Sequence, residues 1–287
     1  MPKIRLEFTK MTGAGNDFVI IDNRRNVIGE NQPAFVRAVS NRRLAIGADG
    51  ILLLEKSGIA DFSMKYFNSD GSYGGFCGNG GRCIARYAYL RGICSRELSF
   101  ESLRHVYKAT VDGETVSLKM KDPKGEQLSL KLGAGGRALR VHFLDTGAPH
   151  VVVFLNENKW LAGRDLEAVN VVTLGRTLRN DPYFGRPGTN VNFVSVHDKF
   201  LSIRTYERGV EEETLACGTG AVASALIAYR IKGMNSPVKI VPRSNEPLAV
   251  SFKQRGDLFE DVYLEGSARI SFVGELRYDT VKRKLIE

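Results

Sequence analysis

Short apolar segments in the first half of the chain, alternating with polar residues or gathered in runs, predict β-strands. The run at 18–22 is apolar until its last residue, which is typical of a strand buried on both faces. Helical spacing occurs only at 35–40 and after residue 77, where Ile84, Tyr87 and Ala88 recur and Gly92 provides a C-cap. The other expected strands of this half are 4–9, 51–54, 62–67, 98–100, 106–111 and 115–121.

The second half repeats this order of elements. A glycine turn and apolar run at 147–154 match those at 15–22, and further strands are expected at 188–194 and 203–206. A helix then follows at 222–230, and strands continue to about residue 276. Because that helix is apolar almost all round, it must be enclosed by protein.

Both principal helices follow the same short stretch, Cys-Gly-Asn-Gly at 77–80 and Cys-Gly-Thr-Gly at 217–220. The first N–H groups of a helix lack intrahelical partners and lie at the positive end of its dipole, so they favour a thiolate and can bind a carboxylate. The recurrence predicts an α/β (α+β) fold of two similar pseudo-symmetric halves. Each half would be a mostly antiparallel sheet or barrel wrapped around a central helix. A cleft between the halves would receive both thiols, and the glycine cluster at 132–137 predicts the boundary.

The composition fits a soluble, cytoplasmic protein. Of 287 residues, 43% are hydrophobic and 25% charged, and no apolar run reaches the roughly 18 residues of a membrane helix. The formal charge of +9 raises nucleic acid as a partner. Lys and Arg are scattered among acidic residues, however, so neither nucleic acid nor a membrane is expected.

The cysteines and glycines predict no metal and no cofactor. The four cysteines lack the spacing of a disulfide framework or a zinc site. Gly13 and Gly15 precede no helix and indicate a tight turn rather than a nucleotide loop. No other stretch has the pattern of a phosphate loop.

Two thiols on opposite sides of one substrate suit the inversion of a carbon centre, because one proton leaves one face and another arrives at the opposite face. One thiolate acts as the base and the other thiol as the acid. The negative charge that develops at the carbon needs hydrogen-bond donors, each worth roughly 2.7–4 kcal/mol. The backbone N–H groups at 78–79 and 218–219 are the candidate donors.

Seven stretches occur together in a characteristic order: 15–18 (Gly-Asn-Asp-Phe), 67–72, 77–80, 149–150 (Pro-His), Asn190, 206–209 (Tyr-Glu-Arg-Gly) and 214–220. With these stretches the chain resembles the diaminopimelate epimerase family. The resemblance implies a cofactor-independent epimerase that interconverts LL- and meso-diaminopimelate for lysine and cell-wall biosynthesis. It implies Cys77 and Cys217 as the base and acid pair, assisted by His150 and Glu207. The implied substrate-binding residues are Asn16, Asn68, Gly78, Asn79, Asn190, Glu207, Arg208, Gly218 and Thr219.

The resemblance also implies that the C-terminal strand, at about 273–287, joins the first half. The expected domains are then 1–132 with that strand, and 133–272. A homodimer is a candidate assembly.

Simpler roles compete with the functional ones. A histidine on an apolar strand, such as His150, is often a packed core residue, Glu207 and Arg208 could pair at the surface, and asparagines form turns by themselves. The paired thiols favour function for these positions. Cys83 and Cys94 are expected to be small buried residues.

The chain departs from the family pattern at three places. Ala148 stands where Asn usually precedes Pro-His, and Gly50 stands where some members carry a glutamine. One extra residue lies between Arg208 and Cys217, in a stretch with an acidic run at 211–213. All three bear on how the far end of the substrate is recognised.

Three other functions remain open. A proline or hydroxyproline racemase would share the architecture and thiol chemistry but typically has histidine where Asn79 stands. A non-catalytic binding module would be expected to lose a thiol, and both are present. A thiol–disulfide oxidoreductase needs a Cys-x-x-Cys pair, which the sequence lacks.

Overall fold

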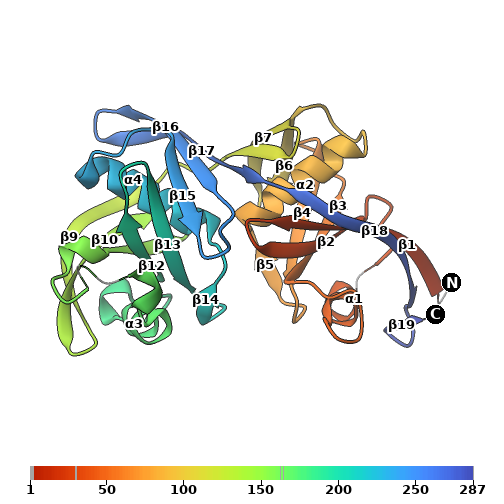
Figure 1. The fold of residues 1–287 in the computed structure, drawn as a ribbon. Helices are drawn as coiled ribbons and strands as arrows, with labels where there is room; N and C mark the ends of the chain where they lie inside the picture. The colour runs from red at the N-terminus through yellow and green to blue at the C-terminus, as the bar shows by residue number, and fades with distance from the viewer. Residues whose placement is uncertain (1–2, 30, 162, 164, 287) are drawn as a thin grey trace. The chain divides into compact units, whose positions relative to one another are not determined.

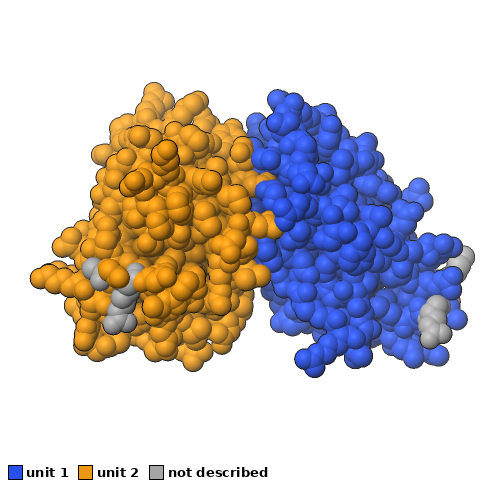
Figure 2. All heavy atoms as spheres, in the orientation of Figure 1, with its two compact units in different colours: residues 1–118, 267–287 blue, residues 119–266 orange. Residues whose placement is uncertain are grey.

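The structure, a computed structural model, describes residues 3–29, 31–161, 163 and 165–286. The chain forms two compact units. Unit 1 consists of residues 1–118 and 267–287, and unit 2 of residues 119–266 (Figure 2).

Unit 1 is a mostly antiparallel sheet around one helix. Its elements are β1 (Lys3–Gly13), β2 (Asn16–Asp22), α1 (Gln32–Ser40), β3 (Gly50–Glu55), β4 (Phe62–Asn68), β5 (Tyr73–Gly75), α2 (Gly78–Leu90), β6 (Glu97–Ser102), β7 (His105–Asp112), β8 (Thr115–Lys119), β18 (Arg269–Asp279) and β19 (Lys284–Ile286). The strands pair in the order β18, β1, β2, β3, β4, β6, β7, β8, with β5 beside β4 and β19 beside β18. Only the pairs β2–β3 and β4–β6 are parallel among those in this order.

Unit 2 has the same pattern. Its elements are β9 (Lys124–Ala134), β10 (Arg137–Asp145), β11 (Pro149–Phe154), the short 3₁₀ helices η1 (Leu155–Glu157) and η2 (Leu166–Ala168), α3 (Val171–Arg179), η3 (Pro182–Phe184), β12 (Asn190–Val196), β13 (Phe200–Glu207), β14 (Glu212–Thr214), α4 (Gly218–Lys232), β15 (Val238–Pro242), β16 (Leu248–Arg255) and β17 (Leu258–Ser267). The order is β9, β10, β11, β12, β13, β15, β16, β17, with β14 beside β13. The parallel pairs are β11–β12 and β13–β15, the counterparts of those in unit 1.

The pairing of the parallel strands aligns the two units residue by residue. Phe18 on β2 pairs with Gly50 on β3, and His150 on β11 pairs with Asn190 on β12, at the first of five matched positions in each pair of strands. The preceding glycines, Gly15 and Gly147, have φ values of 95° and 99°. The predicted fold class, with two similar halves, is therefore confirmed, as is the tight turn at 13–16, where β1 and β2 form a hairpin.

A helix is enclosed by strands in each unit. α2 packs against β1, β2, β3, β4 and β7, and α4 packs against β10 to β13, β15 and β16 (Figure 1). Alternation along the strands gives each sheet two apolar faces: Val19 and Ile21 belong to the core that contains α1 residues, whereas Phe18 lies against Gly80 of α2. This explains why β2 and β11 are apolar on both faces and why α4 is apolar almost all round.

In sequence order the chain repeats as β1–β9 and β10–β18, and the last strand of each repeat pairs within the other unit. β9, which follows β8, pairs with β10, and β18, which follows β17, pairs with β1 from Lys3 with Asp279 to Thr12 with Arg269. Gly135 and Gly136 belong to the glycine cluster that predicts the domain boundary. They form the turn between β9 and β10, with φ values of 60° and 72°. The chain instead passes between the units at 118–119 and 266–267.

Candidate active site

Cys77 is the N-cap residue of α2. Its backbone is extended, with φ −127° and ψ 120°, and its Sγ accepts a hydrogen bond from the backbone N–H of Gly80 at 3.5 Å. Gly78, Asn79 and Gly80 are buried in the first turn. The thiol thus lies at the positive end of the helix, as the sequence predicts.

A chain of directed hydrogen bonds runs from α2 to the β1–β2 turn. Arg82, fully buried, donates through Nη2 to Oδ1 of Asn79 at 2.9 Å. Asn79 donates to Asn16 Oδ1 at 2.7 Å, and Asn16 donates to Asp49 at 3.0 Å. The structure therefore brings together two predicted binding residues, Asn16 and Asn79. The sequence reading missed Arg82 and Asp49, although a helical side chain leans toward the N-terminus of its helix and Arg82 lies one turn inside α2.

The carboxylate of Asp17, beside this chain, is ionised. Burial opposes ionisation of Asp17, but hydrogen bonds from Arg42 and Lys10 outweigh it and lower the pKa of Asp17 to about 2. Arg42 donates to Asp17 at 2.9 Å and also to Asp49 at 2.6 Å. The network around α2 is consequently charged.

Asn68 and Gly50 have structural explanations. Asn68 donates to Ser72 Oγ at 3.0 Å within the turn that leads to β5, the turn-forming role that competed with substrate binding. A Cβ at Gly50 would lie 2.5 Å from the ring of Tyr66 and 2.5 Å from the carbonyl oxygen of Phe67. Because Tyr66 and the Phe67 carbonyl fill this space, position 50 cannot carry a side chain without a shift of both the ring and the backbone of β4.

Cys217 is the N-cap residue of α4, with φ −122° and ψ 112°. Its Sγ lies 3.5 Å from the hydroxyl oxygen of Thr219. Thr219 is held in place by its carbonyl oxygen, which accepts from Thr146 at 2.9 Å, and by its hydroxyl, which lies 2.8 Å from His150 Nε2. His150 thereby reaches the sulfur through one hydroxyl group.

His150 is both a core residue and a partner of the site. Its side chain is fully buried, and its Nδ1 lies 3.1 Å from the amide nitrogen of Asn192. Burial, reinforced by the charge of Arg208, lowers the pKa of His150 to about 3, so the ring is neutral. The sequence reading missed Asn192 and its partner Thr205. The signal was there, because Asn190 and Asn192 stand two residues apart in a mostly apolar strand and so share one face.

Asn190, Glu207 and Arg208 form the edge of the site in unit 2. Asn190 accepts from the backbone N–H of Arg208 at 2.9 Å and donates to the carbonyl oxygen of Pro149 at 2.9 Å. Glu207 accepts from Thr214 at 2.9 Å, and burial raises the pKa of its carboxyl group despite that bond. The pair is not a surface ion pair: Arg208 donates to the carbonyl oxygen of Gly188 at 3.5 Å.

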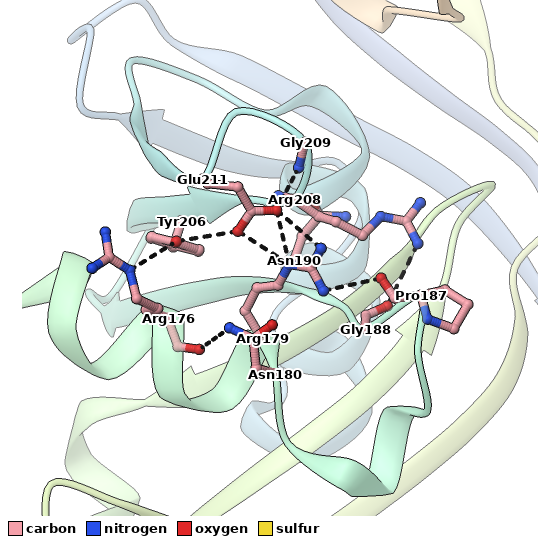
Figure 3. Close-up of polar contacts among 10 residues, drawn as sticks. All are labelled: Arg176, Arg179, Asn180, Pro187, Gly188, Asn190, Tyr206, Arg208, Gly209 and Glu211. Atoms are coloured by element: carbon pink, nitrogen blue, oxygen red, sulfur yellow. Dashed lines mark hydrogen bonds and ion pairs between the residues drawn. The ribbon is translucent and has the colours of Figure 1, made fainter.

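The acidic run at 211–213 anchors this edge. Glu211 accepts from Nε and Nη2 of Arg179 at 3.0 and 2.9 Å, from the N–H of Gly209 at 3.0 Å and from Tyr206 at 3.2 Å (Figure 3). Glu213 accepts from Nε and Nη2 of Arg204 at 2.6 and 2.7 Å. The acidic residues of this stretch therefore hold the turn that carries Arg208.

The other cysteines lie away from the helix N-termini. Cys83 is buried in the middle of α2, as expected. Cys94 is half-buried, and burial raises its pKa to about 11. Among the described residues, no group of three or more His, Cys, Asp or Glu side chains could hold a metal ion, and no helix is long and apolar enough to cross a membrane.

Comparison with known proteins identifies the family. A model of the diaminopimelate epimerase family matches residues 8–125 and 142–270. A diaminopimelate epimerase from Chlorobaculum tepidum is 43% identical over 271 residues, which cover 93% of this chain and 99% of that protein. The chain belongs to the diaminopimelate epimerase family. The diaminopimelate epimerase from Aquifex aeolicus, 41% identical over 292 residues, covers 96% of this chain and is itself covered completely.

Solved structures show the same fold at low identity. A Bacillus anthracis phenazine biosynthesis protein of the PhzF family has a TM-score of 0.70 at 15% identity, over 95% of this chain and 99% of that chain. A hydroxyproline epimerase from Agrobacterium vitis, with bound trans-4-hydroxy-L-proline, has a TM-score of 0.70 at 14% identity, over 96% of this chain and 93% of that chain. The diaminopimelate epimerase family thus shares its fold with proteins of other substrates.

Proposed function

We propose that this protein is an isomerase that interconverts LL- and meso-diaminopimelate without a cofactor, with Cys77 and Cys217 as the two proton carriers. The observation that carries the proposal is the paired placement of the thiols. Each is the N-cap of the enclosed helix of its unit, and each Sγ has a hydrogen-bonding partner in the first turn. Membership of the diaminopimelate epimerase family supports the choice of substrate.

In the proposed reaction one cysteine is a thiolate and the other a thiol. The thiolate takes the α-proton, so that an S–H bond forms, the C–H bond breaks and its electron pair spreads into the α-carboxylate. The other thiol then delivers its proton to the opposite face of the carbon. Backbone N–H groups at Gly78, Asn79, Gly218 and Thr219 stabilise the negative charge. The cysteines exchange roles in the reverse direction.

The remaining residues bind the substrate or assist the thiols. We assign Asn16, Asn68, Asn79, Asn190 and Arg208 to substrate binding. Arg208 has the planar geometry for the distal carboxylate, and Glu207 offers a negative charge for an ammonium group. His150 assists Cys217 through Thr219, which it contacts at 2.8 Å.

The decisive experiment follows exchange at the α-carbon. Purified protein is incubated in D₂O with diaminopimelate, lysine, glutamate or proline at equal enzyme concentration, and deuterium incorporation and product stereochemistry are measured. We expect diaminopimelate to exchange far faster than the other three. Proline turnover within tenfold of diaminopimelate would favour an amino-acid racemase, and exchange with none of the four would favour a binding module.

We also propose a cytoplasmic location and a homodimer. Cell fractionation tests the location. Light scattering of the purified protein at several concentrations tests the assembly, and a monomer mass at all of them would exclude a stable homodimer.

A further inference from the structure

The side chain of Asn192 is buried beneath the first turn of α4, and each of its hydrogen-bonding groups has a partner. Its Nδ2 donates to the carbonyl oxygen of Val151 at 2.9 Å and lies 3.1 Å from Nδ1 of His150. Its Oδ1 accepts from the hydroxyl of Thr205 at 3.0 Å. Nothing in the proposed reaction yet uses this residue.

The contacts of Asn192 fix the direction of its amide and hence the protonation of His150. A carbonyl oxygen only accepts, so the NH₂ group must face Val151, and its second N–H then points at His150 Nδ1. Nδ1 must therefore be the unprotonated nitrogen. Because the low pKa of His150 keeps the ring neutral, its single proton is on Nε2.

The proton on Nε2 sets the direction of the next bond. Nε2–H donates to Thr219 Oγ1 at 2.8 Å, so the hydroxyl of Thr219 receives one bond and keeps its own proton available. The sulfur of Cys217 lies 3.5 Å from that oxygen. A thiolate there can only accept, and the Thr219 hydroxyl then donates to it.

We propose that Asn192 is a positioning residue for the proposed reaction: it holds His150 in the Nε2–H form, so that the Thr219 hydroxyl donates to the Cys217 thiolate. No proton leaves the chain of bonds, since the proton that Cys217 gains comes from the substrate carbon. The inference rests on the proposed function for the role of Cys217 as a base.

The packing of α4 shows that this arrangement is built into the fold. A Cβ at Gly220 would lie 2.2 Å from Asn192 Oδ1 and 3.3 Å from the His150 ring, so the helix rests directly on the amide. Glycine at this position leaves the space that the amide occupies.

Few charged groups bear on the network. Arg208 acts on His150, and Glu207 on β13 is hydrogen-bonded to Thr214. On β10, His142 is paired with Glu157, and Asp145 accepts from the N–H of Gly147. β12 carries no titratable side chain, and in the first turn of α4 the titratable group is the N-cap Cys217 itself.

The first test reads the tautomer directly in the unaltered protein. Nitrogen NMR of protein labelled with ¹⁵N-histidine distinguishes protonated from unprotonated ring nitrogens, and His150→Phe assigns the signals of His150 among the four histidines. We expect Nε2 to carry the proton across the neutral pH range. A proton on Nδ1 would overturn the proposal, and this measurement needs neither substrate nor a folded Asn192 variant.

The second test measures the thiols in the free protein. Asn192→Leu should lower the rate of Cys217 alkylation by iodoacetamide at neutral pH by about 10- to 100-fold, the worth of one hydrogen bond to a charged acceptor, and move its rate–pH profile to higher pH. Cys77, read by peptide mass spectrometry in the same sample, should be unchanged. Thr205→Val should act in the same direction with a smaller effect, and Thr205→Ser should restore the rate.

The matched control is Asn158→Leu. Asn158 is also buried in unit 2, where it accepts from Arg140 N–H and donates to the carbonyl oxygens of Arg140 and Phe154 at 2.8, 3.1 and 2.9 Å. It should destabilise the protein without changing the Cys217 profile. An unchanged profile in Asn192→Leu, or an equal change at Cys77, would refute the proposal. Because the readout is thiol reactivity, failure of the epimerase assignment would appear separately, in the exchange assay.

Discussion

Beneath α2, three matched positions on neighbouring strands hold Phe18, Leu52 and Tyr66, whereas beneath α4 they hold His150, Asn192 and Thr205. The rings of Phe18 and Tyr66 lie 6.0 Å apart, edge to face, and a Cβ at Gly80 would meet Leu52 at 3.1 Å. Where unit 1 has a phenylalanine, a leucine and a tyrosine, unit 2 has a histidine, an asparagine and a threonine that form one hydrogen-bonded network. The backbone around each cysteine is nevertheless almost the same.

The difference shows that the residues beneath the helix can change while the cysteine at its N-cap is kept. In both units a cysteine is the N-cap of a helix that begins Gly-x-Gly. Cys77 then accepts from the backbone N–H of Gly80, while Cys217 lies within hydrogen-bonding distance of the Thr219 hydroxyl. Unit 1 also buries a charge, Arg82, where unit 2 has Val222. The two N-cap thiols, which we propose to serve one reaction, thus lie on helices that pack on a charged network in unit 1 and on a network around the neutral ring of His150 in unit 2.

The largest expected effect comes from removing either sulfur. Cys77→Ala and Cys217→Ala should each lower the epimerisation rate by at least about a hundredfold, because each face of the carbon needs its own proton carrier. The rate of meso product formation from LL-diaminopimelate measures this, with thermal unfolding as the check on the fold. A variant that keeps more than about a hundredth of the rate would show that the two units are not both required.

The two helix glycines give a matched pair. Gly220→Ala places a Cβ 2.2 Å from Asn192 Oδ1, so we expect about 1–3 kcal/mol of destabilisation and a lower rate. In Gly80→Ala the nearest atom is a methyl group of Leu52 at 3.1 Å, which can turn aside, so the change should stay below about 1 kcal/mol. Urea unfolding and the exchange assay test both variants. Equal losses would contradict the difference between the two layers.

The pH dependence of stability should also distinguish the layers. His150 has its pKa lowered to about 3 by burial, whereas an unfolded chain has a histidine pKa near 6.5. Between these values the unfolded state binds a proton that the folded state does not. The free energy of unfolding should therefore fall as the pH drops below 6.5, by up to about 1.4 kcal/mol per pH unit, with no contribution above it.

The variant His150→Phe, which reproduces the residue of unit 1, should lose this slope, whatever its effect on absolute stability. The exposed His197→Gln serves as the control. Urea unfolding between pH 4.5 and 7.5 measures the slope. If the two variants show the same slope as the unaltered chain, the buried ring does not titrate as inferred.

The smallest effect is expected at Ala148, the counterpart of Asn16. Ala148→Asn gives unit 2 the asparagine that unit 1 has at position 16. We expect this position to contact the far end of the substrate and not the reacting carbon. We expect KM for diaminopimelate to change a fewfold and kcat less, because such a contact acts on ground state and transition state alike. Steady-state kinetics with both isomers tests this. A larger change in kcat than in KM would place the residue nearer the chemistry.

The sequence predicted the fold and the position of the two thiols at helix N-termini, because periodicity and turn residues are local signals. About ten residues of sequence suffice to recognise each of three features: the apolar run of β2, the enclosed helix α4 and the two Cys-Gly-x-Gly stretches. Roles that depend on contacts between distant parts of the chain were not predicted: Asn192 contacts His150 on a neighbouring strand, and Asn79, to which Arg82 donates, itself donates to Asn16 in the β1–β2 hairpin. The domain boundary predicted at Gly135 and Gly136 was wrong, because glycines with positive φ suit a hairpin turn as well as a linker.

Because β1 pairs with β18, one edge of β1 stays uncovered until late in the synthesis of the chain. The strand that covers one edge of β1 is made more than 250 residues later, from Arg269 onward, whereas all of unit 2 lies before it in the chain. A nascent chain therefore contains every strand of the second unit before it contains the last strand of the first, the reverse of the usual N-terminal-first order. Until β18 has been synthesised, β1 keeps an open edge that is free to pair with a neighbouring chain. Chains truncated after residue 266 should accordingly aggregate more readily than the full-length protein, and sedimentation of the two would measure it.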